Sequence, residues 1–178
     1  MATFFSDHYT ADGDNLLALV AGYRPSTGIS HGRMRVKTAY FRIETATATN
    51  ADIIRIAPFK SGDRVHRIIY SNDGAATAGD MDIGLYAAGR NHDGAVIDDN
   101  LFADALDITS AILQVDEFKQ STTLDDYDRG KPLWALAAIG GGSDTVDPVL
   151  DYDLTASVPT KPDADTETRV EVWYTAGD

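Results

Sequence analysis

Short stretches of alternating apolar and polar residues, separated by turn-forming residues, recur along most of this chain. The clearest is residues 80–87, where Met81, Ile83 and Leu85 share one face and mainly polar residues share the other. Residues 168–175 alternate in the same way. Because successive side chains of a β-strand point to opposite faces, both stretches are predicted strands with one apolar face.

Weaker versions of the same pattern predict further strands at residues 34–44, 52–59, 64–71, 95–97, 111–118 and 148–159. The alternation of the first changes phase between Tyr40 and Phe41, which predicts a β-bulge near Tyr40. Pro58 is expected to stop the second strand, before a turn at residues 60–63. Gly84, inside the best strand, is expected to admit a neighbouring backbone or to mark a bulge.

Two segments follow other patterns. Residues 98–106 place apolar side chains at i, i+4 spacing behind Asp98 and Asp99, which predicts a short helix capped by one of these aspartates. The apolar run at residues 133–139 is predicted to be a strand buried on both faces, ended by Gly140. About eight short strands with frequent turns predict an all-β protein, an antiparallel β-sandwich or jelly-roll-like fold.

The first 32 residues suit neither a helix nor a sheet interior. They scatter aromatic anchors among glycine, aspartate and proline; the anchors are Phe4, Phe5, Tyr9 and Tyr23, with Arg24 beside the last. We therefore predict an extended N-terminal arm over residues 1–32 and a single β-sandwich domain over residues 33–178. The apolar group at residues 16–20 leaves a second possibility, in which this group packs on the body and the arm ends near Asn15.

Composition narrows the class. The 178 residues contain no cysteine, so packing rather than disulfides or thiolate metal sites must stabilise the fold. No apolar run approaches a membrane span, and the N-terminus lacks the basic and apolar regions of a signal peptide, so we expect no membrane partner. The net charge of −13 argues against a nucleic-acid partner, since cationic contacts dominate affinity for phosphate.

The charge is unevenly distributed: nine Lys or Arg stand against six Asp or Glu in residues 1–70, and six against twenty-two afterwards. Within the early part, Arg33, Arg35, Lys37 and Arg42 form a candidate basic contact face for an acidic partner. The alternative is that these are ordinary charged side chains on solvent faces of strands. The more basic early strands are expected to face a binding partner and the acidic later loops to face solvent.

Signatures of chemistry are scarce. The four histidines lack metal-ligand spacing, the run Gly140–Gly142 lacks the lysine of a phosphate-binding loop, and no nucleophile elbow is present. Oxygen-rich loops at residues 72–82, 91–100 and 144–153 leave structural calcium open, although none fits a calcium-ligand register. We therefore expect no enzyme, no cofactor and no metal. A hydrolase using scattered carboxylates is the enzyme alternative.

Several segments together resemble small virion proteins of tailed bacteriophages that decorate or cement the capsid. They are FFSDHYT (4–10), GRMRVKTAYF (32–41), DIIRIAPFKSGDRV (52–65), DMDIGLY (80–86) and RVEVWYTAG (169–177). These segments are spread over most of the chain, and each is a structural pattern rather than a catalytic signature.

The resemblance implies a β-sandwich, often trimeric, on the exterior of a capsid that is assembled in the host cytoplasm. Its partners are then the major capsid protein and further copies of itself. The aromatic arm residues suit anchors along a shell, because buried Tyr and Phe supply large contact area with few rotors. The alternative is a tail or fibre component with a receptor- or glycan-binding β-sandwich, in which Trp134 or Trp173 stacks on sugar rings.

Overall fold

The computed structural model describes residues 33–50, 52–120, 123–141 and 146–177. The chain divides into two units, Met1–Arg33 and Met34–Asp178, and the fold described here is that of the second. Its described residues form these elements: β1 (Met34–Ile43), β2 (Asp52–Lys60), β3 (Arg64–Asn72), β4 (Asp80–Ala87), β5 (Val96–Asp107), β6 (Ile112–Asp116), the 3₁₀ helix η1 (Glu117–Gln120), α3 (Leu133–Ile139), β7 (Asp151–Thr160) and β8 (Thr166–Thr175).

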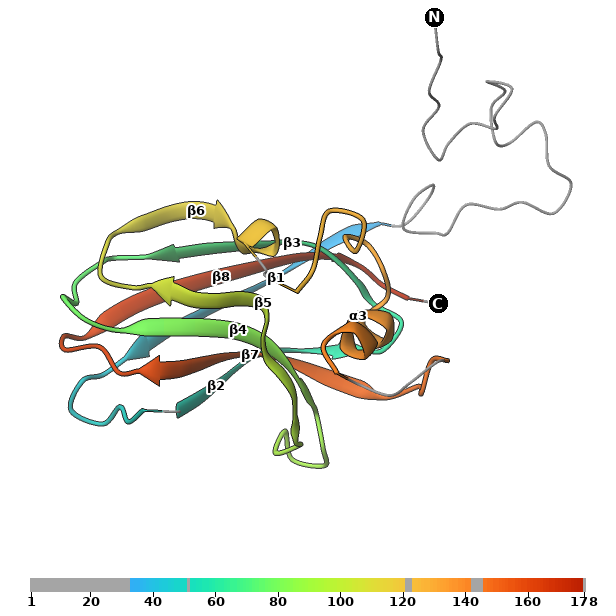
Figure 1. The fold of residues 1–178 in the computed structure, drawn as a ribbon, viewed down its shortest axis with the longest axis horizontal. Helices are drawn as coiled ribbons and strands as arrows, with labels where there is room; N and C mark the ends of the chain where they lie inside the picture. The colour runs from blue at the N-terminus through green and yellow to red at the C-terminus, as the bar shows by residue number, and fades with distance from the viewer. Residues whose placement is uncertain (1–32, 51, 121–122, 142–145, 178) are drawn as a thin grey trace, which may run out of the picture. The chain divides into compact units, whose positions relative to one another are not determined.

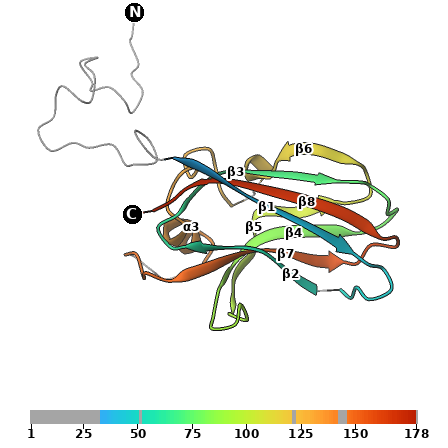
Figure 2. The same ribbon diagram turned by 180° about the vertical axis from the view of Figure 1, so that it is seen from behind.

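Eight antiparallel strands form two four-stranded sheets, in the orders β1-β8-β3-β6 and β2-β7-β4-β5 (Figures 1 and 2). Four of the pairings nest symmetrically around the β4–β5 turn: β4 with β5, β3 with β6, β2 with β7 and β1 with β8. The chain is therefore one long hairpin folded over into two layers, which is the topology of an eight-stranded jelly roll. The predicted all-β antiparallel sandwich is confirmed.

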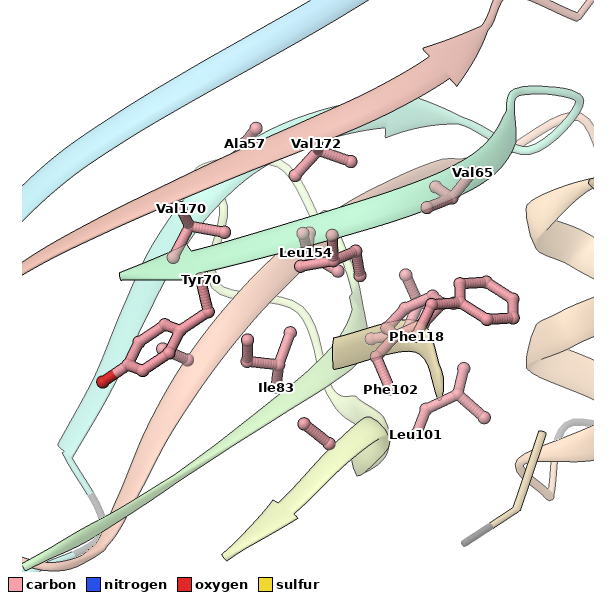
Figure 3. Packing of buried hydrophobic residues seen from close by; sticks show 14 of the residues in the cluster. Ala57, Val65, Tyr70, Ile83, Leu101, Phe102, Phe118, Leu154, Val170 and Val172 are labelled. Carbon is pink, nitrogen blue, oxygen red and sulfur yellow. The ribbon is translucent and has the colours of Figure 1, made fainter. Parts of the chain in front are cut away.

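The core lies between the two sheets, where the apolar faces of the strands meet (Figure 3). Val170 and Val172 of β8 point into it from one sheet, and Ile83 of β4 and Leu154 of β7 from the other; all four are fully buried. This is the alternation read from residues 80–87 and 168–175. Phe102 and Phe118 pack with ring centroids 5.7 Å apart and join β5 to η1.

Strand β1 pairs with β8 residue for residue from Met34 to Ile43, so the bulge expected near Tyr40 is wrong. The apparent change of phase arises because Val36 and Tyr40 lie on an exposed apolar face, while Phe41 points toward the core. Strand β2 also continues through Pro58 to Lys60. Pro58 is tolerated because β2 is an edge strand, where a missing N–H breaks no ladder bond on the open side.

Residues 98–106 form strand β5, not the predicted helix. Between Met81 and Tyr86, β4 advances five residues while its partner β5 advances ten, from Leu106 back to Val96. These bulges, together with a positive φ of 51° at Ala105, destroy the period-2 pattern and produce i, i+4 apolar pairs by coincidence. The geometry at Gly84 is as expected: an added Cβ would lie 2.3 Å from backbone atoms of Asp98 and Asp99.

Residues 133–139 form helix α3, not the predicted buried strand. Its buried residues Leu133, Leu136 and Ala137 fall at the i, i+3, i+4 spacing of one helix face. Five of its seven residues are Leu or Ala, which are strong helix formers, and Gly140 donates its N–H to Leu136 at the C-terminus. The prediction that this run is largely apolar and packs in the core is confirmed. Seven residues are too few, however, to distinguish the helical period of 3.6 from the strand period of 2.

Candidate interaction surfaces

The solvent-facing side of the sheet β1-β8-β3-β6, here called the outer sheet face, exposes apolar side chains. Met34 is 50% exposed, Val36 44% and Tyr40 72%, all on β1. The strand register places Val36 beside Trp173 of β8 and Trp173 beside Arg67 of β3. The Trp173 side chain is half-buried. Alternation therefore gives the first strand one side for the core and one apolar side that no described residue covers.

The charges of the outer sheet face compensate one another. Arg42 Nη2 lies 2.5 Å from Asp165 Oδ2, and Arg67 Nε lies 3.4 Å from Asp116 Oδ2. Arg169 is ion-paired with Glu171, and its guanidinium also lies 5.6 Å from the ring centroid of Tyr40. On a chain with a net charge of −13, this face is close to neutral.

Two shallow grooves cross the same face. The larger has a volume of about 670 Å³ and runs between Tyr40 and Leu113, over Ser71 and Arg169. The smaller, about 230 Å³, lies between Trp173 and Gln114. Leu113 is 80% exposed, so exposed apolar side chains lie on both edge strands of this face, β1 and β6. Trp173 and the paired charges of β8 and β3 lie between them. A surface of this composition is suited to contact with another macromolecule.

The four residues predicted to form one basic face are divided by the structure. Arg35 and Lys37 lie on the core side of β1, at its open edge, whereas Arg42 lies on the opposite side and pairs with Asp165. The Lys37 ammonium lies 4.1 Å from the ring centroid of Phe59 and donates to the carbonyl of Pro58. Burial lowers the pKa of Lys37. Arg33 is exposed and precedes β1.

The predicted arm anchors Phe4, Phe5, Tyr9, Tyr23 and Arg24 lie outside the described residues. Of the two tryptophans, Trp134 is half-buried on α3 and packs against the core, as expected. Trp173 lies on the outer sheet face, and its indole N–H is buried with no hydrogen-bond partner in the described part of the chain. The sequence pattern did not identify the outer sheet face, because that surface is assembled from four strands.

Two histidines have structural partners. His92 Nδ1 lies 2.9 Å from Asp153 Oδ1, and the Asp153 carboxylate, 1% exposed, also lies 3.6 Å from Arg55 Nη1. Arg55 in turn donates to the carbonyl of Gly94, 3.2 Å away. This cluster fastens the β4–β5 turn to the sheet. His66 lies 3.0 Å from Thr175 Oγ1, and burial lowers the pKa of His66.

Among the described residues, no group of three or more His, Asp or Glu side chains is placed to hold a metal ion. The aspartates of the oxygen-rich loops instead accept hydrogen bonds from the backbone. Asp80 accepts from Thr160 N–H at 2.7 Å, Asp98 from Asn100 N–H at 3.2 Å and Asp147 from Val149 N–H at 2.8 Å. These carboxylates therefore stabilise turns and strand ends.

Comparison with known proteins yields structural neighbours only. No family model and no curated protein sequence matches this chain. A chain of the capsid of Ralstonia phage GP4 is similar over 81% of this chain and 86% of its own length, with a TM-score of 0.53 and 13% identity. A chain of the cyanophage Pam1 capsid asymmetric unit covers 94% of this chain and 99% of its own length, with a TM-score of 0.49 and 15% identity.

Both neighbours are chains of phage capsids. At such low identity, the likeness to the GP4 chain shows a shared fold. No helix within the described part of the chain is long and apolar enough to cross a membrane.

Proposed function

We propose that this protein is a structural, non-enzymatic component of a phage virion that decorates or cements the capsid exterior. In this role it binds the outer surface of the major capsid protein and stabilises the head. The GP4 capsid chain among its structural neighbours and the resemblance of its sequence segments both support the assignment. Each bound copy stabilises the assembled shell by mass action.

One observation carries the proposal: the outer sheet face is apolar and nearly neutral on a strongly acidic protein. Association with a large partner is favoured where apolar area is removed from water and where no unpaired charge must be desolvated. The three arginines of this face already have carboxylate partners, so covering it leaves no cation unpaired. Glu167 and Asp73, beside the larger groove, are the carboxylates that the partner would have to meet. We therefore assign the contact with the shell to this face.

The test is co-sedimentation of the purified protein with shells of the cognate major capsid protein that lack it, followed by imaging. Saturable binding with the outer sheet face against the shell is the expected result. Absence of binding at micromolar concentration would overturn the proposal.

Tyr40→Asp is expected to weaken shell binding by about tenfold to a hundredfold, because it replaces the most exposed aromatic side chain of β1 on this face with a charge. The fold should tolerate the change, since Tyr40 is 72% exposed. Tyr127→Asp is the matched control, because Tyr127 is 90% exposed on another part of the surface. Equal affinity of the two variants in quantitative co-sedimentation would contradict the assigned face.

The arm has its own test. Deleting residues 2–15 is expected to leave a folded domain that binds shells at least tenfold more weakly, because the aromatic anchors Phe4, Phe5 and Tyr9 are removed. Far-UV circular dichroism checks the fold, and occupancy on shells is measured by sedimentation. Wild-type occupancy after the deletion would remove the arm from the proposal.

A second function is favoured by one observation, the groove of about 670 Å³ beside the exposed Tyr40. An exposed aromatic ring beside hydroxyl and amide groups suits a sugar, so a tail or fibre module that binds a host glycan is the other candidate. A glycan array decides between the two: a binder that is lost with Tyr40→Ala supports the tail role. An array without binders, together with binding to shells, supports the capsid role.

A further inference from the structure

Two carboxylates that line the larger groove of the outer sheet face have no cation of their own. They are Asp73, which follows β3, and Glu167 of β8, and both side chains are exposed. The two residues are neighbours, since the Asp73 N–H donates to the Glu167 carbonyl at 3.2 Å. Neither forms an ion pair with any described residue. Arg42 lies beside Glu167 in the strand register, but its guanidinium is hydrogen-bonded to Asp165.

The same groove has an apolar side. The Tyr40 ring and the Leu113 side chain are among the most exposed apolar groups of the outer sheet face, at 72% and 80%. Strand β6 is bulged against β3 at residues 113–114, where it advances three residues while β3 advances two. Gln114 has a positive φ of 57°, and its backbone N–H donates to Ser71 Oγ. A bulge of this kind re-aims a side chain, here Leu113, toward solvent.

Unpaired carboxylates are ordinary on this protein, because 28 Asp or Glu stand against 15 Lys or Arg. Asp73 and Glu167 differ from the others by their position, since they lie on the face that we assign to the shell contact. Covering a carboxylate that has no cation costs the desolvation of its charge. A contact through this face therefore requires the partner to bring a cation to the groove.

An arginine side chain fits this combination of groups. Its planar guanidinium presents five N–H donors, so it can bond two carboxylates and stack on an aromatic ring. Its apolar stem can lie against Leu113. A metal ion would use neither Tyr40 nor Leu113, and the described residues offer it no group of three acidic or histidine side chains. Arg169 also lines the groove, but its charge is compensated by Glu171.

We propose that the larger groove of the outer sheet face binds an arginine side chain of the shell protein. The guanidinium meets Asp73 and Glu167, and the stem packs between Tyr40 and Leu113. The identity of the partner rests on the proposed function, whereas the preference of the groove for a guanidinium does not. Tyr40→Asp removes the ring and adds a third carboxylate that one guanidinium does not neutralise, so this variant still weakens the contact.

The preference of the groove is tested on the full chain without shells, by titration with N-acetyl-arginine amide followed by NMR. We expect the amide signals of Tyr40, Leu113 and Glu167 to shift, with a Kd of about 1–10 mM. N-acetyl-citrulline amide is the control, because it has nearly the same shape without the charge, and it should bind about tenfold more weakly or less. Equal shifts with both probes, or no shift at these three residues, would overturn the proposal.

The link to the shell is tested by co-sedimentation. Asp73→Asn combined with Glu167→Gln is expected to weaken shell binding about tenfold or more and to reduce its dependence on salt. The fold should tolerate the changes, since Asn keeps the Oδ1 that accepts from the Ala75 N–H. Asp99→Asn combined with Asp104→Asn is the matched control. It changes the net charge equally at exposed residues of β5, in the other sheet, and should bind as the wild type does.

The two experiments separate this proposal from the proposed function. Equal affinity of the two double variants for shells would overturn the arginine contact and leave shell binding standing. A wild type that does not bind shells would overturn the proposed function, and the titration with the arginine and citrulline probes would still decide what the groove recognises.

Discussion

Replacing Gly84 by alanine is expected to destabilise the domain by about 3 kcal/mol or more. Gly84 lies in the middle of β4, and a Cβ added there would come within 2.3 Å of the Asp98 carbonyl oxygen and of the Asp99 carbonyl group. These are backbone atoms of β5, so relief requires moving a strand rather than rotating a side chain. Strand β5 carries Leu101, Phe102 and Ala103, all fully buried, and the displacement therefore propagates into the core.

Urea unfolding followed by tryptophan fluorescence measures the effect. Gly62→Ala is the matched control, because its added Cβ would lie 3.4 Å from Gly177 Cα, an ordinary contact. Both changes reduce the conformational entropy of the unfolded chain alike, so their difference isolates the contact with β5. Equal unfolding midpoints for the two variants would show that β5 does not press against Gly84 as the structure indicates.

The strands that sequence predicted best are those whose own residues alternate without interruption. Residues 80–87 form β4, and the predicted strand 168–175 lies within β8 (Thr166–Thr175). In β8 one face is the core, so burial imposes a period of two that survives in the sequence. In β5 the bulges remove that period, and an irregular edge strand then resembles a helix. Local pattern therefore identified the strands whose own residues alternate without interruption, whether or not the partner strand is bulged.

Local sequence pattern could not predict which strands, far apart in the chain, pair with one another. Strand β1 pairs with β8, and the Arg42–Asp165 ion pair joins residues 123 positions apart. The sequence alone could have predicted that the basic face is divided. Arg35 and Lys37 occupy odd positions of the strand and Arg42 an even one, so their side chains point to opposite sides. The sequence could not have predicted the apolar outer sheet face, because Val36, which is half-exposed, and Val172, which is buried, look alike in the sequence pattern.

The other large expected effect concerns Glu117, whose side chain is 1% exposed at the start of η1. Its Oε2 has no hydrogen-bond partner in the described part of the chain. Burial, with repulsion from Asp116, raises the pKa of Glu117 to about 7. The folded state therefore holds this proton more tightly than the unfolded state, where the pKa is 4.5. The stabilisation of the folded state by this proton is fully present below pH 4.5 and is lost as the pH rises through about 7.

Glu117→Gln removes this dependence, because the amide stays neutral at every pH. We expect the variant to be more stable than the wild type by about 3 kcal/mol at pH 8 and nearly equal to it at pH 4. Urea unfolding of both proteins at several pH values measures the difference in their free energies of unfolding. The pH-dependent contributions of the carboxylates that both proteins share cancel in this difference. Glu44→Gln, at an exposed glutamate, is the control and should show a small difference at every pH. A stability gain for Glu117→Gln that is the same at pH 4 and pH 8 would mean that Glu117 does not titrate between them in the fold.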